Sequence, residues 1–189
     1  MTEELNAVSF CPDSAMADVL KAMQEPGASS LQALTGTLET WSSDPRLHLL
    51  RGATYASQHD YAHAKTDFIA ALTLAPDYAV ARFMLGFLEL TNGEVELALH
   101  AWAPLDALPA DDTLRIFKSG LVELVHDRFD DALRQLRLGM VSNRRYPLIN
   151  HYVAAVIEKI ADPLAQTEAS VDHVPEWVAG NRYTPPSKP

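Results

Sequence analysis

The side chains best placed to do chemistry in this sequence are two histidines, His59 and His63, in the stretch HDYAH. On a helix, residues four apart share one face, which is the spacing of a pair of zinc ligands. A zinc site needs a third and a fourth ligand, and the nearby Asp60 and Asp67 do not complete an HExxH-type pattern. We therefore interpret the two histidines as part of a solvated turn and the first helical turn after it, and expect no metal site.

A second candidate is a pair of carboxylates, Glu89 and Glu123, which lie 34 residues apart. Two carboxyl groups act as general acid and general base when a cleft separates their pKa values. Nothing in the sequence indicates such a cleft. We expect instead that these glutamates form salt bridges with Arg82, Arg115 or Lys118, or that they face water.

The single cysteine, Cys11, precedes Pro12 and has no histidine beside it in the sequence that would lower its pKa. We expect a free, unreactive thiol in a flexible N-terminal arm, residues 1–12. The motifs GxSxG, GxxxxGK[ST], GxGxxG and CxxC are absent from the sequence. The sequence therefore predicts no enzyme and no cofactor.

Composition narrows the class of protein. The chain has 189 residues, 48% of them apolar, which is enough for a sizeable core, and its net charge is −10. An acidic chain repels phosphate backbones, so nucleic acid is not an expected partner. No apolar run approaches the roughly 20 residues that a membrane span needs. We expect a cytoplasmic protein that does not insert into membranes.

Small residues at a fixed spacing indicate an internal repeat of 34 residues. A glycine recurs with this period inside helix-like sequence, an alanine follows it after 12 residues, and a bulky residue follows after four more. The three rows are Gly52, Gly86 and Gly120, then Ala64, Ala98 and Ala132, then Phe68, Trp102 and Leu136. Each glycine costs a helix about 1 kcal/mol relative to alanine. Such a repeated cost indicates that another backbone comes very close to each glycine.

Capping and breaking signals between these rows predict the helices. Asp44 and Pro45 are typical of an N-cap and a first helical position. Pro104 ends a helix near Ala103, so that 104–112 form an irregular connection. The predicted helices are 13–25 and 29–41 as a degenerate pair, then 45–58 with 60–74, 78–91 with 94–103 and 112–125 with 128–142, and finally 147–161 alone.

Residues 45–78 resemble a tetratricopeptide repeat. Six residues match that family's glycine, tyrosine, alanine, aromatic, alanine and proline in order, namely Gly52, Tyr55, Ala64, Phe68, Ala71 and Pro76. The resemblance implies an all-α fold, a right-handed superhelical stack of antiparallel helix pairs over 13–161. Its parts are a degenerate pair 13–43, repeats 45–78, 79–112 and 113–146, and a capping helix 147–161, followed by a proline-containing tail 162–189. Such arrays are scaffolds with many partners.

The resemblance also implies a concave groove lined by the first helix of each pair. The residues expected to line it are Leu49, Phe83, Phe87, Leu90, Phe117, Leu121, Leu124 and His151. The helix containing "RFMLGFLEL" is apolar around most of its circumference, so something must cover its second face. Aromatic anchors in a concavity suit an apolar helix or extended peptide of a partner protein. We therefore predict a non-catalytic adaptor or chaperone.

Alternatives stay open at this point. In one alternative, the groove is covered by the N-terminal pair, by the tail or by a second copy in a homodimer, and the protein is an assembly part. In another, the protein is an accessory subunit of an enzyme. We also consider that Val174 to Tyr183 of the tail docks on the array. One subclass of tetratricopeptide domains, the carboxylate clamp, binds the C-terminal carboxylate of chaperones through a lysine and an asparagine. This chain has Leu49 and Ala53 at those two places, so a carboxylate ligand is not expected. The overall plan is similar to that of the chaperones for type III secretion translocators.

Overall fold

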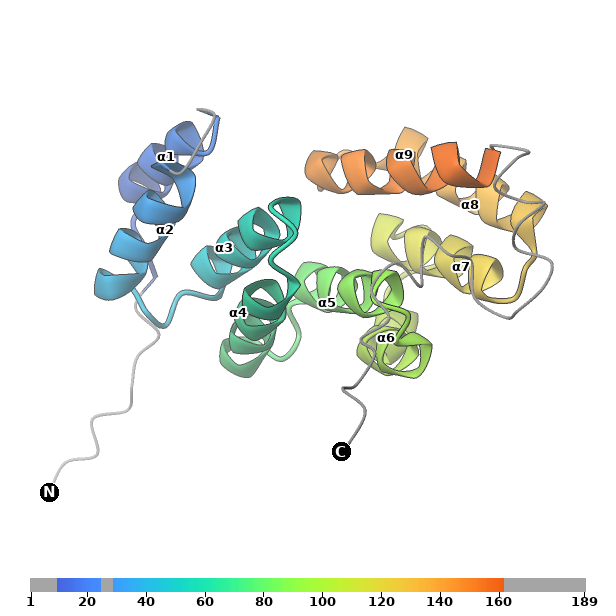
Figure 1. The fold of residues 1–189 in the computed structure, drawn as a ribbon, viewed down its shortest axis with the longest axis horizontal. Coiled ribbons are helices and arrows are strands. Elements are labelled where there is room, and N and C mark those ends of the chain that lie inside the picture. The colour runs from blue at the N-terminus through green and yellow to red at the C-terminus, as the bar shows by residue number, and fades with distance from the viewer. Residues whose placement is uncertain (1–9, 25–28, 162–189) are drawn as a thin grey trace, which may run out of the picture. The chain divides into compact units, whose positions relative to one another are not determined.

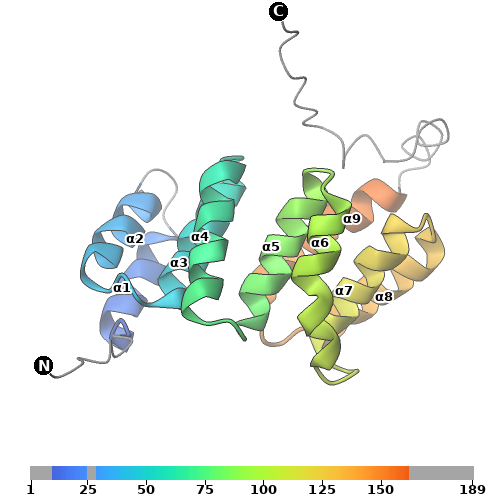
Figure 2. The same cartoon turned by 90° about the horizontal axis from the view of Figure 1, so that it is seen from below.

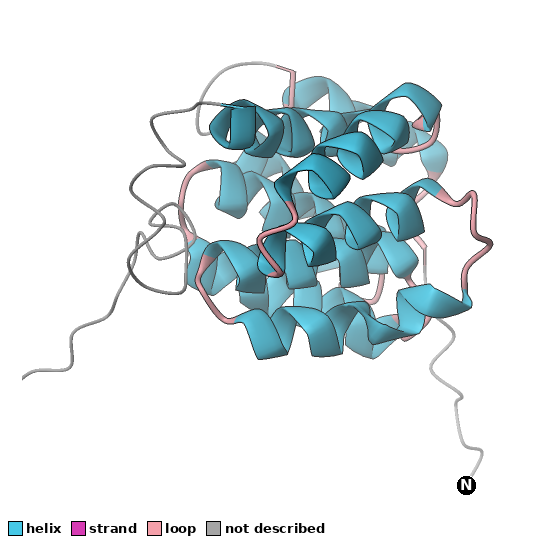
Figure 3. Cartoon of the chain, turned by 90° about the vertical axis from the view of Figure 1, so that its right-hand side faces the viewer, coloured by secondary structure: helices cyan, strands magenta, loops and turns pink. Residues whose placement is uncertain are grey.

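The computed structural model describes residues 10–24 and 29–161. Helices and loops, without strands, make up these ranges (Figure 3). In chain order the helices are α1 (Asp13–Ala22), α2 (Ser29–Thr40), α3 (Pro45–Ser57), α4 (Tyr61–Leu74), α5 (Ala79–Thr91), α6 (Val95–Trp102), η1 (Ala103–Ala107, a 3-10 helix), α7 (Thr113–Val125), α8 (Phe129–Ser142) and α9 (Pro147–Ala161). The predictions for residues 1–9 and for the tail 162–189 lie outside the described residues.

The helix positions predicted from the sequence are confirmed to within one residue at nearly every end. The exception is α1, which ends at Ala22 instead of 25. Local signals account for this agreement. The Asp44 side chain accepts the Arg46 N–H at 2.9 Å at the start of α3, and Asp112 accepts the Leu114 N–H at 2.9 Å at the start of α7.

Pro104 interrupts the second helix of the middle pair as predicted. The α-helix α6 ends at Trp102, and Ala103–Ala107 continue as the 3-10 helix η1. A proline ring clashes with the preceding turn and has no N–H to donate, which removes the α-helical hydrogen bond at that point. Leu105 is buried in this short helix, so the connection still contributes an apolar side chain to the core.

The repeated glycines pack against the bulky residues that follow them by 16 positions. A Cβ atom built on Gly52 would lie 2.8 Å from Phe68 Cε1, and one on Gly86 only 2.3 Å from Trp102 Nε1. A Cβ atom built on the third glycine, Gly120, would lie 2.8 Å from Leu136 Cδ2. A close backbone was expected at each glycine. At Gly52 the Ala64 carbonyl oxygen would lie 3.2 Å from the added Cβ, but at all three glycines the nearest atoms belong to a large side chain.

The turn inside each helix pair repeats one backbone conformation. Positive φ angles occur at His59 (62°), Gly93 (82°) and Asp127 (59°), again 34 residues apart. Glycine adopts this left-handed conformation without steric cost, whereas histidine and aspartate adopt it less readily. The recurrence of this conformation at two non-glycine residues shows that the packing of the pair dictates the turn.

The chain divides into two compact units, one that ends at Leu85 and one that begins at Gly86, so that the division falls within α5. In the first unit α1 packs on α2, α2 on α3, and α3 on α4 (Figure 1). In the second unit α6 and η1 contact α7, α7 packs on α8, and α8 packs on α9 (Figure 2). None of the helices in the described ranges is long and apolar enough to cross a membrane.

The buried core of the degenerate N-terminal pair includes a residue that the sequence analysis placed in a flexible arm. Its members are Cys11, Val19, Leu34, Leu38 and Leu47. Cys11 is 2% exposed, so at this position the expectation of an arm was wrong. The physical reason is that α1 and α2 offer an apolar surface that a small thiol fills as a hydrophobic side chain.

The glycine contacts predict opposite outcomes for two identical substitutions. Gly86→Ala places a methyl group inside the Trp102 indole, and we expect the free energy of unfolding to fall by about 2 kcal/mol. Gly36→Ala is the matched control, because Gly36 in α2 has no atom within 4 Å of the added Cβ. There we expect a gain of about 0.5–1 kcal/mol. Urea unfolding of both variants measures the difference, and equal effects would contradict the packing.

Candidate functional site

Three rings of the second unit that are not fully buried, those of Phe87, His151 and Tyr152, form one group. Phe87 of α5 lies beside Tyr152 of α9, with ring centroids 6.0 Å apart and planes at 59°. His151 contacts the Tyr152 ring edge-on, with centroids 6.0 Å apart at 73°. Phe87 and Tyr152 are half-buried and His151 is exposed. The group therefore presents ring edges, a hydroxyl and an imidazole at one place.

Burial has an electrostatic consequence at this group. It raises the pKa of the Tyr152 hydroxyl above its usual range, because the phenolate would lose hydration. The hydroxyl is therefore protonated at neutral pH and can donate a hydrogen bond. An apolar ring with a polar tip is a common element of protein contact surfaces.

Phe87 and His151 of this group were expected from the sequence, whereas Tyr152 was not. The repeat pattern assigned His151 of the last helix to the groove. Tyr152, the next residue, is not among the positions that the pattern assigns to it. A signal was present, because Tyr152 is the only Phe, Tyr or Trp between 147 and 161.

Most other residues expected to line the groove are buried. Leu49 is half-buried, whereas the fully or nearly fully buried set is Phe83, Leu90, Phe117, Leu121 and Leu124. The contacts of Phe117 show why. A Cβ atom on Gly139 of α8 would lie 2.5 Å from Phe117 Cδ1, so this ring packs within the α7–α8 pair. Its assignment as an exposed anchor was therefore wrong.

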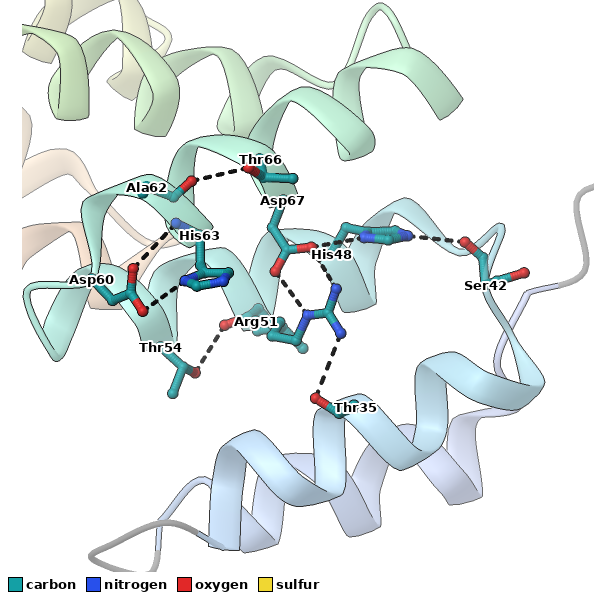
Figure 4. A network of polar contacts seen from close by, with 11 residues as sticks. Thr35, Ser42, His48, Arg51, Thr54, Asp60, Ala62, His63, Thr66 and Asp67 are labelled. Atoms are coloured by element: carbon teal, nitrogen blue, oxygen red, sulfur yellow. Dashed lines mark hydrogen bonds and ion pairs between the residues drawn. The ribbon is translucent and has the colours of Figure 1, made fainter.

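The two histidines of HDYAH have separate partners. His63 Nδ1 lies 2.8 Å from Asp60 Oδ2 (Figure 4). The His63 ring also stacks on Tyr55, with centroids 5.0 Å apart. His59 Nδ1 lies 2.9 Å from the Tyr61 hydroxyl. Within the described ranges, no group of three or more His, Cys, Asp or Glu side chains is arranged to hold a metal ion.

The two glutamates of the repeat are also in different environments. Glu89 is 4% exposed, which excludes the expectation that it faces water. Glu123 pairs with Arg128, a residue that the sequence analysis did not consider. Lys118, one of the expected partners, binds Asp106 with an Nζ–Oδ1 distance of 2.7 Å. Among the ion pairs of the described residues, Glu123 thus binds Arg128, which lies five residues later in the turn after α7.

A buried carboxylate, Asp44, ties the N-terminal segment to α3. It is completely buried and accepts the Cys11 N–H at 2.8 Å and Arg46 Nη2 at 2.7 Å. Arg46 Nη2 also donates to the Cys11 carbonyl oxygen at 2.8 Å. Burial acts to raise the pKa of Asp44, but the hydrogen bonds from Arg46 and Cys11 outweigh it and lower the pKa.

The same cluster determines the chemistry of the thiol. Burial, with the nearby Asp44 charge, raises the pKa of Cys11 above its usual range. A thiol with a raised pKa has little thiolate at neutral pH and is a poor nucleophile. This agrees with the expectation of an unreactive cysteine, although the cause is burial.

A second buried carboxylate, Asp67 of α4, binds two side chains of α3 (Figure 4). Arg51 donates to it twice, from Nε and from Nη2, each at 2.8 Å. His48 Nδ1 lies 3.0 Å from Asp67 Oδ1, and His48 Nε2 lies 2.9 Å from the Ser42 carbonyl oxygen. Both ring nitrogens therefore face acceptors, and this arrangement favours an imidazolium that donates from both.

The charges of this network stabilise one another. The hydrogen bond with Asp67 raises the pKa of His48 above its usual range, against the effect of burial. Burial acts to raise the pKa of Asp67, but the hydrogen bonds from Arg51 and His48 lower it. The network joins α3, α4 and the loop before α3, and sequence reasoning did not anticipate it.

The His48 network predicts a pH dependence of stability. A histidine with a raised pKa in the folded state adds stability that is complete below its unfolded pKa, about 6.5. That contribution is lost as pH rises through the higher folded pKa. We expect the free energy of unfolding to fall over this range, and to fall less in His48→Gln, whose amide does not titrate. Urea unfolding at a series of pH values measures both; parallel curves would contradict an imidazolium at His48.

Comparison with known proteins supports the fold. No protein-family model matches the chain, and no curated protein matches it. The solved structure "MamA RS-1 ArsTM double mutant" is similar, with a TM-score of 0.53 and 17% sequence identity over 87% of this chain and 99% of that one. MamA is a TPR-like protein. At this identity the likeness bears on the fold alone, and this chain has an all-α, TPR-like fold of helix pairs.

Proposed function

We propose that this protein is a non-catalytic protein-interaction module, an adaptor or chaperone, that binds an apolar segment of a partner protein. The observation that carries the proposal is the aromatic group of Phe87, Tyr152 and His151, which stays partly accessible on a TPR-like stack of helices. Aromatic side chains bury a large area at low cost in conformational entropy, and they are frequent in the energetically dominant part of protein interfaces.

The proposed surface is smaller than the groove expected from the sequence. Phe83, Phe117 and Leu121 are completely buried, so we assign them to the core and not to partner contact. Phe87 and Tyr152 then remain as apolar anchors, with His151 at the exposed edge. A partner segment with one or two apolar side chains and a hydrogen-bond acceptor for the Tyr152 hydroxyl suits this group.

Charge contributes to the choice of partner in this proposal. The chain carries 25 Asp and Glu against 15 Lys and Arg. A net negative protein attracts positively charged partners over distances of about 8 Å in physiological salt. At long range this favours a partner with a net positive charge. Residues 132–157, which include His151 and Tyr152, carry four arginines and no aspartate or glutamate, so the net charge does not decide which residues flank the bound segment.

Peptide selection on the full-length chain tests this proposal. We expect a random display library to yield peptides with apolar cores, and Phe87→Glu to weaken their binding by about thirtyfold. Leu97→Glu is the matched control, since Leu97 of α6 is 46% exposed and lies outside the group. Fluorescence anisotropy measures the affinities, and circular dichroism confirms that the variants stay helical.

A second variant tests the same surface in case Phe87→Glu unfolds the protein. The His151 side chain is exposed, so His151→Ala leaves the packing intact and should weaken peptide binding severalfold. If Leu97→Glu weakens binding as much as Phe87→Glu, the aromatic group is not the site. If Phe87→Glu instead converts a dimer to a monomer in light scattering, the surface belongs to a homodimer and the protein is an assembly part.

A further inference from the structure

The outer face of α8 exposes a stripe of basic and apolar side chains. Arg134, Arg137, Leu138 and Val141 are all exposed, and their spacing places them along one side of the helix. Leu138 is 53% exposed and Val141 is 77% exposed. Large aliphatic side chains that lie this open, next to one another, are a feature of interaction surfaces.

The stripe continues into the connection with α9. Arg144 and Arg145 are exposed in the turn, and Leu148 in the first turn of α9 is 67% exposed. Asn143 orders this turn, because its Nδ2 donates to the Tyr146 carbonyl at 2.7 Å and its Oδ1 accepts the Tyr146 N–H at 2.9 Å. We call the combined surface the α8–α9 patch, and its members are Arg137, Leu138, Val141, Arg144, Arg145 and Leu148.

The charge of the patch is opposite to that of the protein. Residues 132–157 contain four arginines and no aspartate or glutamate, in a chain whose net charge is −10. Arg134 pairs with Asp131 at 2.6 Å, and Arg145 lies over the Tyr146 ring at 5.4 Å. Across the ranges that the structure covers, no carboxylate pairs with Arg137, Arg144 or Arg145. The patch thus combines unneutralised guanidinium groups with open aliphatic side chains, which suits an acidic segment that also carries apolar residues.

We propose that residues 162–181 of the same chain bind the α8–α9 patch. The sequence of this segment, DPLAQTEASVDHVPEWVAGN, has four acids and no lysine or arginine. Its apolar residues are interspersed with the acids, at Val171, Val174, Trp177 and Val178. Both features complement the patch, whose Leu148 lies one helical turn before His151 of the aromatic group.

The segment has the length to reach the patch. It follows α9 directly at Ala161, and Leu148 lies 13 residues earlier, or about 20 Å along the helix. The 16 residues from Ala161 to Trp177 span up to about 50 Å when extended, which is enough to return along α9. A tethered segment also has an effective concentration of about 1 mM, so a contact of modest intrinsic strength is occupied.

Photo-crosslinking in the full-length chain tests this contact. With benzoylphenylalanine at position 177, we expect monomeric crosslinks that mass spectrometry maps to residues 134–148. The triple variant Arg137→Glu, Arg144→Glu and Arg145→Glu should lower the crosslink yield about tenfold, and 1 M NaCl should lower it in the wild type.

A charge exchange supplies the matched control. The variant Glu168→Lys, Asp172→Lys and Glu176→Lys should also lose the crosslink, and combining both triple variants should restore it with the original net charge. Crosslinks outside residues 134–148, or a yield that the exchange does not change, would overturn the proposal. Crosslinks that join two chains would show that the segment binds a second copy, and would overturn the intrachain contact.

Discussion

The structure depends on the close approach of the two helices within each pair, which a glycine at one fixed position permits. Gly86 lies so near Trp102 that a methyl group has no room, and Trp102 is completely buried as a result. The same offset of 16 residues also relates a pair of charged side chains that lies one position earlier in the first repeat. Arg51 and Asp67 have the same offset as Gly52 and Phe68, so the register of apolar packing brings these charges together.

Polar groups reinforce the packing differently in the two units. In the first unit the buried carboxylates of Asp44 and Asp67 each accept several hydrogen bonds, and they hold α3 against the N-terminal segment and α4. A buried carboxylate with too few donors would destabilise the fold, so each of these sites depends on all of its partners. In the second unit the ion pairs of Lys118 and Arg134 are more exposed, whereas Phe117 and Leu136 are completely buried.

The exposed surfaces that remain differ in chemistry. Phe87, Tyr152 and His151 offer aromatic edges to an apolar ligand, whereas the α8–α9 patch offers guanidinium groups and aliphatic side chains. One surface therefore suits a partner protein and the other suits an acidic segment. The arginines of the patch lie before α9 in the chain, so they can be substituted without changing Phe87, His151 or Tyr152.

The sequence by itself determined the helices, because caps and prolines act within a turn or two of chain and the 34-residue period repeats the pattern of helix pairs. Asp44, Pro45 and Pro104 each mark an end that the structure confirms. Only the tertiary structure decided which apolar side chains are exposed to solvent. Phe117 occupies an expected groove position, yet its ring packs on Gly139 in the next helix. Exposure depends on contacts between segments far apart in the chain, and neither the pairing of His48 with Asp67 nor that of Phe87 with Tyr152 leaves a local signature.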